Sequence, residues 1–268
     1  MKHELPITVR IKKVIDEAEG IKSFLLPCKL DAKPGQFSMI WLPGVDAKPV
    51  SISYQDQDHI GVTISSVGPW SKKVCQLKEG NLLGVLGPYG NAFQLEGKSI
   101  VLVGGGYGAA SLMLLAEEAL LQKRTVTMII GAKTEAQILY RKRVDALGLN
   151  TLFTTDDGSF GQRGYTTDVL AHILKNQKVD SVYVCGPELM EKKVAELCRD
   201  SGVPSYISLE RHMKCGFGVC GACCLDEIGK RVCVEGTVFR GEEVLQIKEF
   251  GQYHRDSSAT KHPFGAQS

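Results

Sequence analysis

Short runs of apolar residues, several of them alternating with polar ones, occupy the first third of the chain. Gly, Pro or Asp bounds each run, and the runs lie at 7–15, 21–27, 36–42, 50–54 and 60–66. Strands at this spacing, with no long helix between them, predict a small antiparallel β-barrel. Residues 70–77 predict one short helix. The free N–H groups at its start, around Gly68 and Ser71, suit a pyrophosphate, although a plain surface crossover that closes the barrel explains the same spacing.

From residue 100 onward the apolar pattern alternates between strand and helix. Predicted strands lie at 100–103, 125–130, 151–154, 181–184 and 206–209. Predicted helices lie at 110–122, 167–174 and 188–198. This alternation predicts a parallel sheet covered on both faces, with ligands at the carboxyl ends of its strands. Residues 230–234 predict part of a small hairpin, and residues 251–268, polar and without periodicity, are expected to be disordered or to bind a partner.

Composition narrows the class of protein. The 268 residues suffice for about two domains and a small appendage, and 43% hydrophobic with 23% charged residues is ordinary for a globular protein. A net charge of +2 gives no reason to expect a nucleic-acid partner. Because Glu117 and Glu118 interrupt the longest apolar runs, we expect no membrane span. Residues 1–10 lack the features of a signal peptide, so we expect a cytoplasmic protein.

Cysteines crowd into one stretch, with five of the nine between residues 215 and 233. Such crowding is typical of a metal site in a reducing compartment. The C-x4-C-x2-C spacing, with a fourth thiol after nine more residues, is that of a plant-type 2Fe-2S cluster, and its candidate ligands are Cys215, Cys220, Cys223 and Cys233. A zinc site would usually use two C-x2-C pairs, and only one is present. A disulfide pair is a further alternative.

Three glycines, Gly216, Gly218 and Gly221, lie between these cysteines. A loop that points several thiolates inward must turn sharply and bring backbone N–H groups close to the sulfurs, which glycine permits. Cys224, the neighbour of Cys223, is a surplus thiol that we interpret as a small buried residue or a spare ligand.

A glycine-rich loop follows the first strand of the middle region. Gly104, Gly106 and Ala109 match G-x-G-x-x-A between a strand and a helix, where backbone amides, including that of Gly105, approach a diphosphate. The next strand ends at Lys133 with no acidic residue to hold a ribose. This favours a nucleotide module of the ferredoxin-reductase kind.

Three segments resemble ferredoxin-reductase-like flavoproteins. Lys48-Pro49-Val50-Ser51-Ile52 is similar to the R-P-x-S-(I/L) strand that lies against the isoalloxazine, with Lys48 in place of arginine as a point charge for an anion. The stretch Gly87-Pro88-Tyr89-Gly90-Asn91-Ala92-Phe93 resembles the G-P-x-G-x-x-F turn that ends the flavin domain. Cys185-Gly186-Pro187 resembles the C-G-P turn beside nicotinamide and flavin, which makes Cys185 the candidate catalytic residue; a simple strand-to-helix turn is the alternative.

Taken in order, residues 5–245 resemble the electron-transfer subunit of class B, NAD-linked, dihydroorotate dehydrogenase. Further matches are Gly35-Gln36-Phe37 and Met213-x-Cys215-Gly216-x-Gly218-x-Cys220-x-x-Cys223. The resemblance implies bound FAD, a 2Fe-2S cluster and NAD(H). It also implies a partner, an FMN-containing catalytic subunit, with two copies of each chain. FAD would convert between the two-electron hydride and single electrons, so that electrons pass from the partner's FMN through the cluster and FAD to NAD+ in pyrimidine biosynthesis.

The resemblance divides the chain into four parts: an FAD-binding β-barrel domain (1–96), an NAD-binding α/β domain (97–205), a 2Fe-2S domain (206–250) and a polar tail (251–268). A related alternative is the diaphorase subunit of a hydrogenase or of a ferredoxin:NADP oxidoreductase. Some of those relatives have Asp at the first cluster position, where this chain has Cys215. An alternative of another class is a zinc-stabilised nucleotide-binding regulator. Lys133 could tolerate a 2′-phosphate, which leaves the choice between NAD and NADP open.

Overall fold

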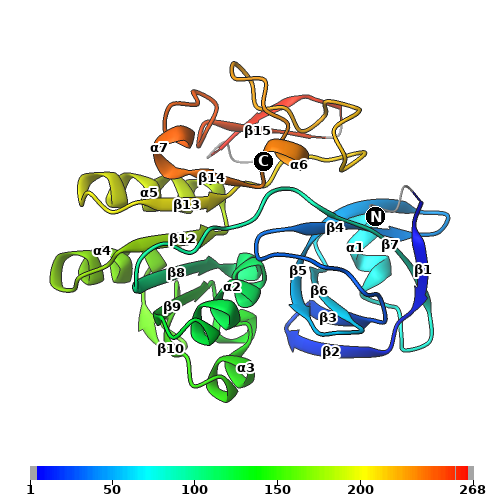
Figure 1. Ribbon diagram of the computed structural model, residues 1–268, viewed down its shortest axis with the longest axis horizontal. Coiled ribbons are helices and arrows are strands. Elements are labelled where there is room, and N and C mark those ends of the chain that lie inside the picture. The colour runs from blue at the N-terminus through cyan, green and yellow to red at the C-terminus, as the bar shows by residue number, and fades with distance from the viewer. Residues whose placement is uncertain (1–4, 257, 265–268) are drawn as a thin grey trace.

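The computed structural model describes residues 5–256 and 258–264, and its first third is a curled antiparallel sheet (Figure 1). The strand order is β1, β7, β4, β5, β6, β3, β2. The strands are β1 (Ile7–Arg10), β2 (Lys13–Ala18), β3 (Ile21–Leu26), β4 (Phe37–Leu42), β5 (Asp46–Gln55), β6 (Ile60–Ser65) and β7 (Leu82–Tyr89). The sheet encloses a core that includes Phe24, Ile40 and Val62, and helix α1 (Pro69–Val74) adds Trp70 and Val74 to it. The predicted antiparallel flavin-domain fold is confirmed.

The run at 7–15 forms two strands, whereas the apolar pattern predicts one. β1 pairs with β7 at one edge of the sheet, and β2 pairs with β3 at the other. Between them Ile11 donates its N–H to Asn81, and Lys12 donates its N–H to Leu25, each at 2.9 Å. Ile11 is buried in the same core as its neighbours. The apolar pattern therefore continues through the crossover and does not reveal it.

The second sheet has the order β11, β10, β9, β8, β12, β13, β14. All pairs from β11 to β13 are parallel, and β14 is antiparallel. The strands are β8 (Ser99–Gly105), β9 (Thr125–Ala132), β10 (Asn150–Thr155), β11 (Gln162–Arg163), β12 (Ser181–Cys185), β13 (Ser205–Ser208) and β14 (Val238–Arg240). The helices between them are α2 (Ala109–Leu121), α3 (Arg141–Ala146), α4 (Thr166–Asn176) and α5 (Glu188–Asp200). The predicted parallel module is confirmed.

Alternate residues of each central strand serve opposite faces of this sheet. Ile100 and Leu102 pack with α2, whereas Val101 and Val103 pack with residues of α4 and α5. Because both faces are covered, the strands read as continuous apolar runs. Helix α2 also contacts β5, so it stands between the two sheets, as Figure 1 shows. Its N-terminus therefore lies where the two sheets meet.

The cysteine-bearing segment is an insertion between two strands of the second sheet. β13 pairs with β12, and the chain then runs through residues 209–237 before β14 pairs with β13. β13 thus crosses the 205/206 boundary of the predicted domains. The predicted hairpin at 230–234 forms only at its start: an antiparallel β-bridge joins Cys224 to Arg231, and helix α6 (Val232–Glu235) then replaces the rest. Cys233 therefore lies on a helical turn.

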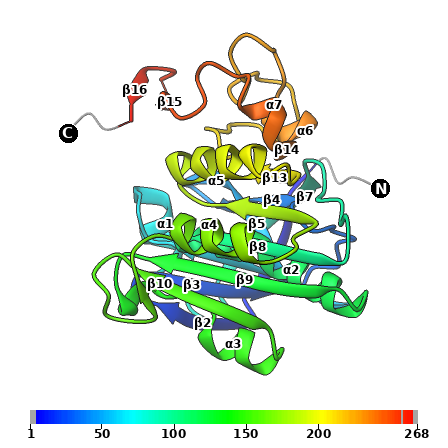
Figure 2. The ribbon, with the colours of Figure 1, turned by 90° about the vertical axis from the view of Figure 1, so that its left-hand side faces the viewer.

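The C-terminal stretch is ordered over most of its described length, and the expectation of disorder is wrong there. After helix α7 (Gly241–Val244), strands β15 (Tyr253–Arg255) and β16 (Lys261–Pro263) form a hairpin. Figure 2 shows this hairpin and the cysteine-bearing segment on the side of the molecule where α5 lies. Residues 257 and 265–268 of the predicted tail lie outside the described residues.

A helix that crosses a bilayer needs about 20 mostly apolar residues. The longest helices, α2 and α5, have 13 residues each. Across the described ranges, no helix combines the length and the apolar character of a membrane span.

Candidate functional site

A cavity of about 440 Å³ opens between the curled sheet, helix α2 and the segment 208–213. This size is in the range of cofactor pockets. Six residues that the sequence singles out line it together: Lys48, Pro49, Val50, Ser51, Gly68 and Ser71. We call it the flavin cavity, because these are the residues expected to hold FAD. Their individual roles stay predictions.

Polar groups at the mouth of the flavin cavity are already partly engaged. The Lys48 ammonium lies 2.7 Å from Asp46, and this hydrogen bond is the main reason that the pKa of Asp46 falls below its usual range. Ser71 Oγ accepts the N–H groups of Gly68 at 2.9 Å and Val67 at 3.0 Å. Ser71 therefore caps its own helix, and the backbone N–H groups of the helix start remain the donors for an anion.

Cys185 reaches the flavin cavity only through a second side chain. Its thiol donates to Ser111 Oγ at 3.4 Å, and Ser111 donates to Ser51 Oγ at 2.8 Å. Cys185 is 1% exposed and lines neither this cavity nor the one described next. Burial, with the nearby carboxylates of Glu210 and Glu191, raises the pKa of the thiol well above its usual value. At neutral pH Cys185 is a neutral hydrogen-bond donor.

A second cavity, of about 590 Å³, lies at the carboxyl ends of β8, β9 and β10. Of the residues predicted to hold a dinucleotide, Gly105, Gly106 and Pro187 line it, as does Lys133. A dinucleotide is expected at such strand ends. We call this the nicotinamide cavity.

The glycines around the nicotinamide cavity serve different needs. A Cβ on Gly104 would lie 2.7 Å from the Cα of Ala109, and one on Gly186 would lie 2.9 Å from the Cα of Gly105. These two glycines let backbones approach closely. Gly106 has φ +55 and open space beside it, so its backbone can face a ligand.

Sequence reasoning missed the wall that the two cavities share. Tyr107 lines both, and its hydroxyl donates to Glu210 Oε2 at 2.9 Å. Burial raises the pKa of Glu210. Tyr107 stands inside the glycine-rich motif, so its position could have been inferred from the loop. Glu210 and its neighbours 208–213 carry no motif, and only the path of the chain brings them to the flavin cavity.

The four predicted cluster ligands come together as two pairs of thiols. The Cys215 thiol contacts that of Cys220, and the Cys223 sulfur contacts the thiol of Cys233 and accepts its N–H at 3.4 Å. Two thiolates for each of two irons is the arrangement that a 2Fe-2S cluster needs. In the described residues no group of three or more His, Cys, Asp or Glu side chains is arranged around a single metal ion.

Backbone donors converge on Cys215. Burial alone would raise the pKa of this thiol, but the N–H groups of Cys220, Phe217 and Val219, with the Cys220 thiol, outweigh burial and lower the pKa to about 6. A nest of N–H groups stabilises the thiolate form that ligates iron. Cys224 takes no part in either pair: among the described residues, its thiol hydrogen-bonds to the Gly229 carbonyl, at 3.9 Å.

The cluster loop, residues 215–223, lies against the wall of the flavin cavity. A Cβ on Gly216, where φ is +81, would lie 2.6 Å from Met39 Cγ, so only glycine fits this approach. The rings of Phe37, Tyr89 and Phe217 follow one another with centroids 5.9 and 6.2 Å apart. Phe37 lines the flavin cavity and Phe217 belongs to the loop, so one row of rings joins the two.

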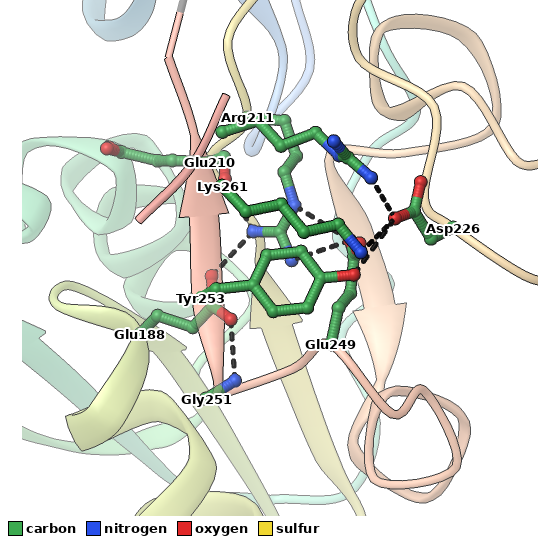
Figure 3. A network of polar contacts seen from close by, with 9 residues as sticks. Glu188, Glu210, Arg211, Asp226, Glu249, Gly251, Tyr253 and Lys261 are labelled. Carbon is green, nitrogen blue, oxygen red and sulfur yellow. Dashed lines mark hydrogen bonds and ion pairs between the residues drawn. The ribbon is translucent and has the colours of Figure 1, made fainter. Parts of the chain in front are cut away.

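Arg211, in the segment that leads into the loop, is the centre of a buried ion network (Figure 3). It pairs with Glu188 at 2.6 Å and with Glu249 at 3.2 Å, and the three side chains are 8%, 9% and 4% exposed. Glu188 also accepts the N–H of Gly251 at 2.6 Å. Because Glu188 follows Pro187 at the nicotinamide cavity, the network ties that cavity to the loop and to the C-terminal stretch.

The C-terminal hairpin contacts the cysteine-bearing segment (209–237) through the carboxylate of Asp226. Tyr253 donates its hydroxyl to Asp226 at 2.9 Å, Arg255 pairs with Asp226, and Lys261 lies 3.6 Å from it (Figure 3). Hydrogen bonding to Arg255 is the main cause of the lowered pKa of Asp226. These contacts explain why a polar stretch without periodicity is ordered.

Two family profiles match the chain. Residues 210–245 match the iron-sulfur cluster binding domain of dihydroorotate dehydrogenase B, and residues 102–196 match the oxidoreductase NAD-binding domain. Both matches fall on regions that the geometry already connects with thiols and with a dinucleotide. They favour iron and sulfide over a structural zinc ion.

Among solved structures, a chain of the NADH-dependent reduced ferredoxin-NADP oxidoreductase is 30% identical, with a TM-score of 0.81, over 90% of this chain and 92% of that one. Phthalate dioxygenase reductase is 16% identical with a TM-score of 0.65, over 81% and 85% of the two chains, which shows the fold alone. The ferredoxin-reductase-like fold is therefore shared.

Curated relatives extend over nearly the whole chain. The probable dihydroorotate dehydrogenase B (NAD(+)) electron transfer subunit of Methanocaldococcus jannaschii is 43% identical over 96% of this chain and 98% of the relative. The protein of the same description from Methanothermobacter thermautotrophicus is 41% identical over 97% and 98%. Identity at this level across both full chains exceeds that to the ferredoxin-NADP oxidoreductase. The chain belongs to the family of electron transfer subunits of NAD-linked dihydroorotate dehydrogenase B.

Proposed function

We propose that this chain carries electrons between NAD(H) and the FMN of a dihydroorotate dehydrogenase catalytic subunit, through FAD and a 2Fe-2S cluster, in pyrimidine biosynthesis. The observation that carries the proposal is the position of the flavin cavity. It shares Tyr107 with the nicotinamide cavity, and its wall residue Phe37 packs through Tyr89 against the cluster loop. FAD, when bound, supplies the conversion between a two-electron hydride and the single electrons that a cluster accepts.

The residues around the flavin cavity would bind and orient the FAD. Lys48 and the backbone N–H groups at the start of α1 provide positive charge for a pyrophosphate. Cys185 donates to Ser111 and Ser111 donates to Ser51, so the proton of the Ser51 hydroxyl is free to point into the cavity. In this arrangement Cys185 supports the Ser51 hydroxyl as a neutral donor. Tyr107 separates this cavity from the nicotinamide cavity. A nicotinamide ring that approaches the flavin would therefore have to fit beside the Tyr107 side chain.

The dinucleotide is NAD(H) by the description of the relatives. In this chain Gly104, Gly105 and Gly106 would receive the diphosphate, and Gly186 and Pro187 would lie beside the nicotinamide. Lys133 and Asp156 both line the nicotinamide cavity, so it presents charges of both signs to the far end of the dinucleotide.

The catalytic partner would contain FMN and assemble with this chain as two copies of each.

All nine cysteines are unpaired thiols. Thiols that ligate iron persist in a reducing compartment, so we place the complex in the cytoplasm. The four-part division at residues 96, 205 and 250 is kept as a proposal, with β13 shared between the second and third parts.

A diaphorase of the ferredoxin-NADP oxidoreductase kind is the second candidate function. The 30% identity to that enzyme's chain over 90% of the sequence supports it. Identifying the bound flavin does not distinguish the two candidate functions, whereas identifying the catalytic partner does.

Flavin content tests the proposal at the cavity itself. Flavin released by acid from the purified protein should be FAD, because the cavity is continuous with the start of α1, where a pyrophosphate would lie. Chromatography of the released flavin identifies it. Recovery of FMN, or of protein that takes up no flavin on reconstitution, would count against the proposal.

The partner should dock on the exposed side of the cluster loop. Phe217 is 52% exposed and Val219 is 77% exposed, next to two cluster ligands. A charge buried at an interface without a partner is unfavourable, so Phe217→Glu should weaken assembly with the catalytic subunit, measured by co-purification. NADH oxidation with a dye should remain. Leu121→Glu, at an 83% exposed position on α2, is the matched control, and equal assembly by both variants would refute the surface.

A further inference from the structure

The loop after β7 meets the chain that leaves the cluster. We call residues 235–238 the return segment, since they lead from Cys233 and α6 into β14. Figure 1 shows α6 beside the loop that follows β7. Asn91 of that loop and Glu235 are 144 residues apart in sequence, yet their atoms are hydrogen-bonded.

Asn91 uses every polar atom of its carboxamide on the return segment. Its Nδ2 donates to the carbonyl of Glu235 at 3.1 Å and to that of Val238 at 2.7 Å. Its Oδ1 accepts the N–H of Val238 at 2.8 Å, and its backbone N–H donates to the carbonyl of Gly236. Only an amide offers donors and an acceptor in this fork. Asn91 therefore hydrogen-bonds to the backbone of the return segment at both of its ends.

Two glycines make room for this contact. Gly90 has φ +78, and a Cβ there would lie 2.9 Å from the Gly236 carbonyl oxygen. Gly35 has φ +92, and a Cβ there would lie 2.9 Å from Val238 Cγ2. The Gly35 carbonyl also accepts the hydroxyl of Thr237 at 2.9 Å. The curled sheet is thus shaped to hold the return segment at close range.

The return segment connects the flavin cavity with the helix that carries a predicted cluster ligand. Thr237 lines the flavin cavity, and Cys233 lies on α6, whose last residue is Glu235. From Glu235 the connection continues into the loop: its carboxylate pairs with Arg231 at 2.6 Å, and Arg231 donates to the Gly218 carbonyl at 2.9 Å. A shift of the return segment would move Cys233 and the loop relative to the flavin cavity.

We propose that Asn91 is a positioning residue that fixes the cluster at its working distance from the flavin, by clamping the return segment to the flavin domain. This rests on the proposed function, in which electrons cross one at a time between the cluster and the flavin, with no bond made or broken in the chain. Such a transfer slows steeply with distance. Asn91 touches neither cofactor site, since it lines neither cavity and is not a thiol ligand.

Two variants remove the clamp in different ways. Asn91→Ala deletes all three side-chain hydrogen bonds. Asn91→Asp keeps the shape and the acceptor for Val238, but points a carboxylate oxygen at the carbonyls of Glu235 and Val238, which is repulsive. Asn81→Ala is the matched control: the Asn81 side chain accepts the Lys78 N–H at 2.8 Å within the same domain and is exposed.

Stopped-flow absorbance of the holoprotein separates the relevant steps. Reduction of the flavin by NADH and NADH oxidation with ferricyanide should match the parent protein in all variants, and iron content should be retained. Reduction of the cluster after the flavin should be several-fold slower in both Asn91 variants than in the parent protein, because the transfer of a single electron slows steeply as the distance between the two centres grows. Asn81→Ala should leave it unchanged.

Hydrogen exchange gives a readout that needs no electron transfer. In Asn91→Ala the amides of α6 and of Val238 should lose protection, while those of β4 keep theirs. Unchanged protection, or cluster reduction at the parental rate, would overturn the positioning role. Parallel loss of iron, flavin reduction and ferricyanide activity would also overturn it, in favour of a general structural role. A parent protein whose cluster is never reduced by NADH would instead refute the proposed function. Hydrogen exchange would still test whether Asn91 holds the return segment in place.

Discussion

Replacing Cys223 by serine should leave the protein without its cluster, whereas the same change at its neighbour Cys224 should leave the cluster in place. Cys223 is 2% exposed and its sulfur contacts the Cys233 thiol, the second half of an iron-binding pair. A serine hydroxyl is a much harder ligand than a thiolate and does not suit a cluster iron. Cys224 makes one weak contact, to the Gly229 carbonyl.

Iron and sulfide analysis of anaerobically purified protein measures this effect. The parent protein and Cys224→Ser should each carry about two irons and two sulfides per chain, with visible absorbance, as a 2Fe-2S centre requires. Cys223→Ser should lose both. Stoichiometric zinc in a colourless parent protein would contradict the cluster, and equal iron in the two serine variants would contradict the ligand assignment.

Replacing Arg211 by methionine should have the largest effect on stability outside the cysteines. Arg211 lies between Glu188 and Glu249, and all three side chains are less than 10% exposed. Burial already raises the pKa of Glu249, an effect that Arg211 partly offsets. Removing Arg211 would leave two buried carboxylates without the cation that pairs with both of them. Breaking a buried ion pair in this way costs about 3–5 kcal/mol.

Denaturant unfolding of the flavin-loaded protein measures the loss, and Arg199→Met provides the comparison. The Arg199 and Asp200 side chains are 56% and 66% exposed, and exposed pairs contribute only about 0–1 kcal/mol. Because Arg211 also lines the flavin cavity, its variant should retain less flavin. Equal stability of the two variants would mean that the buried network does not hold the cluster-bearing segment.

Periodic stretches with local causes could be predicted closely. The helix expected at 110–122 forms at Ala109–Leu121, between a glycine-rich turn and the next strand. Its strand neighbours are continuous apolar runs because both faces of the sheet are covered. Four of the six flavin-cavity residues, Lys48 to Ser51, belong to one short motif, and the other two, Gly68 and Ser71, lie at the start of a predicted helix.

Features that depend on distant partners could not be predicted. Residues 251–268 are expected from the sequence to be disordered or to bind a partner, but the hairpin of β15 and β16 is held by Asp226, which lies in the cysteine-bearing segment. The wall of the flavin cavity formed by residues 208–213 and Thr237 follows from the placement of the cysteine-bearing insertion between β13 and β14. The break between β1 and β2 is hidden because Ile11 faces the same core as the strands.

The position of Cys233 shows the same limit at the site. Its spacing from Cys223 identifies it as the fourth thiol, but the predicted hairpin stops before Cys233, which lies on a helical turn, α6. That turn ends at Glu235, whose carbonyl accepts a hydrogen bond from Asn91, 144 residues earlier in the chain. The local sequence is enough to identify Cys233 as a ligand, whereas its backbone conformation depends on contacts with distant parts of the chain.

The electron-transfer role is tested most directly by assaying the isolated chain with and without an FMN-containing catalytic subunit. Alone, the FAD- and cluster-loaded chain should oxidise NADH with an artificial acceptor and should not oxidise dihydroorotate, because in the proposed division of labour dihydroorotate reacts at the FMN of the catalytic subunit. On addition of the catalytic subunit, dihydroorotate should reduce NAD+. Dihydroorotate oxidation by the chain alone, or no NADH formation by the assembled complex, would contradict the division of labour.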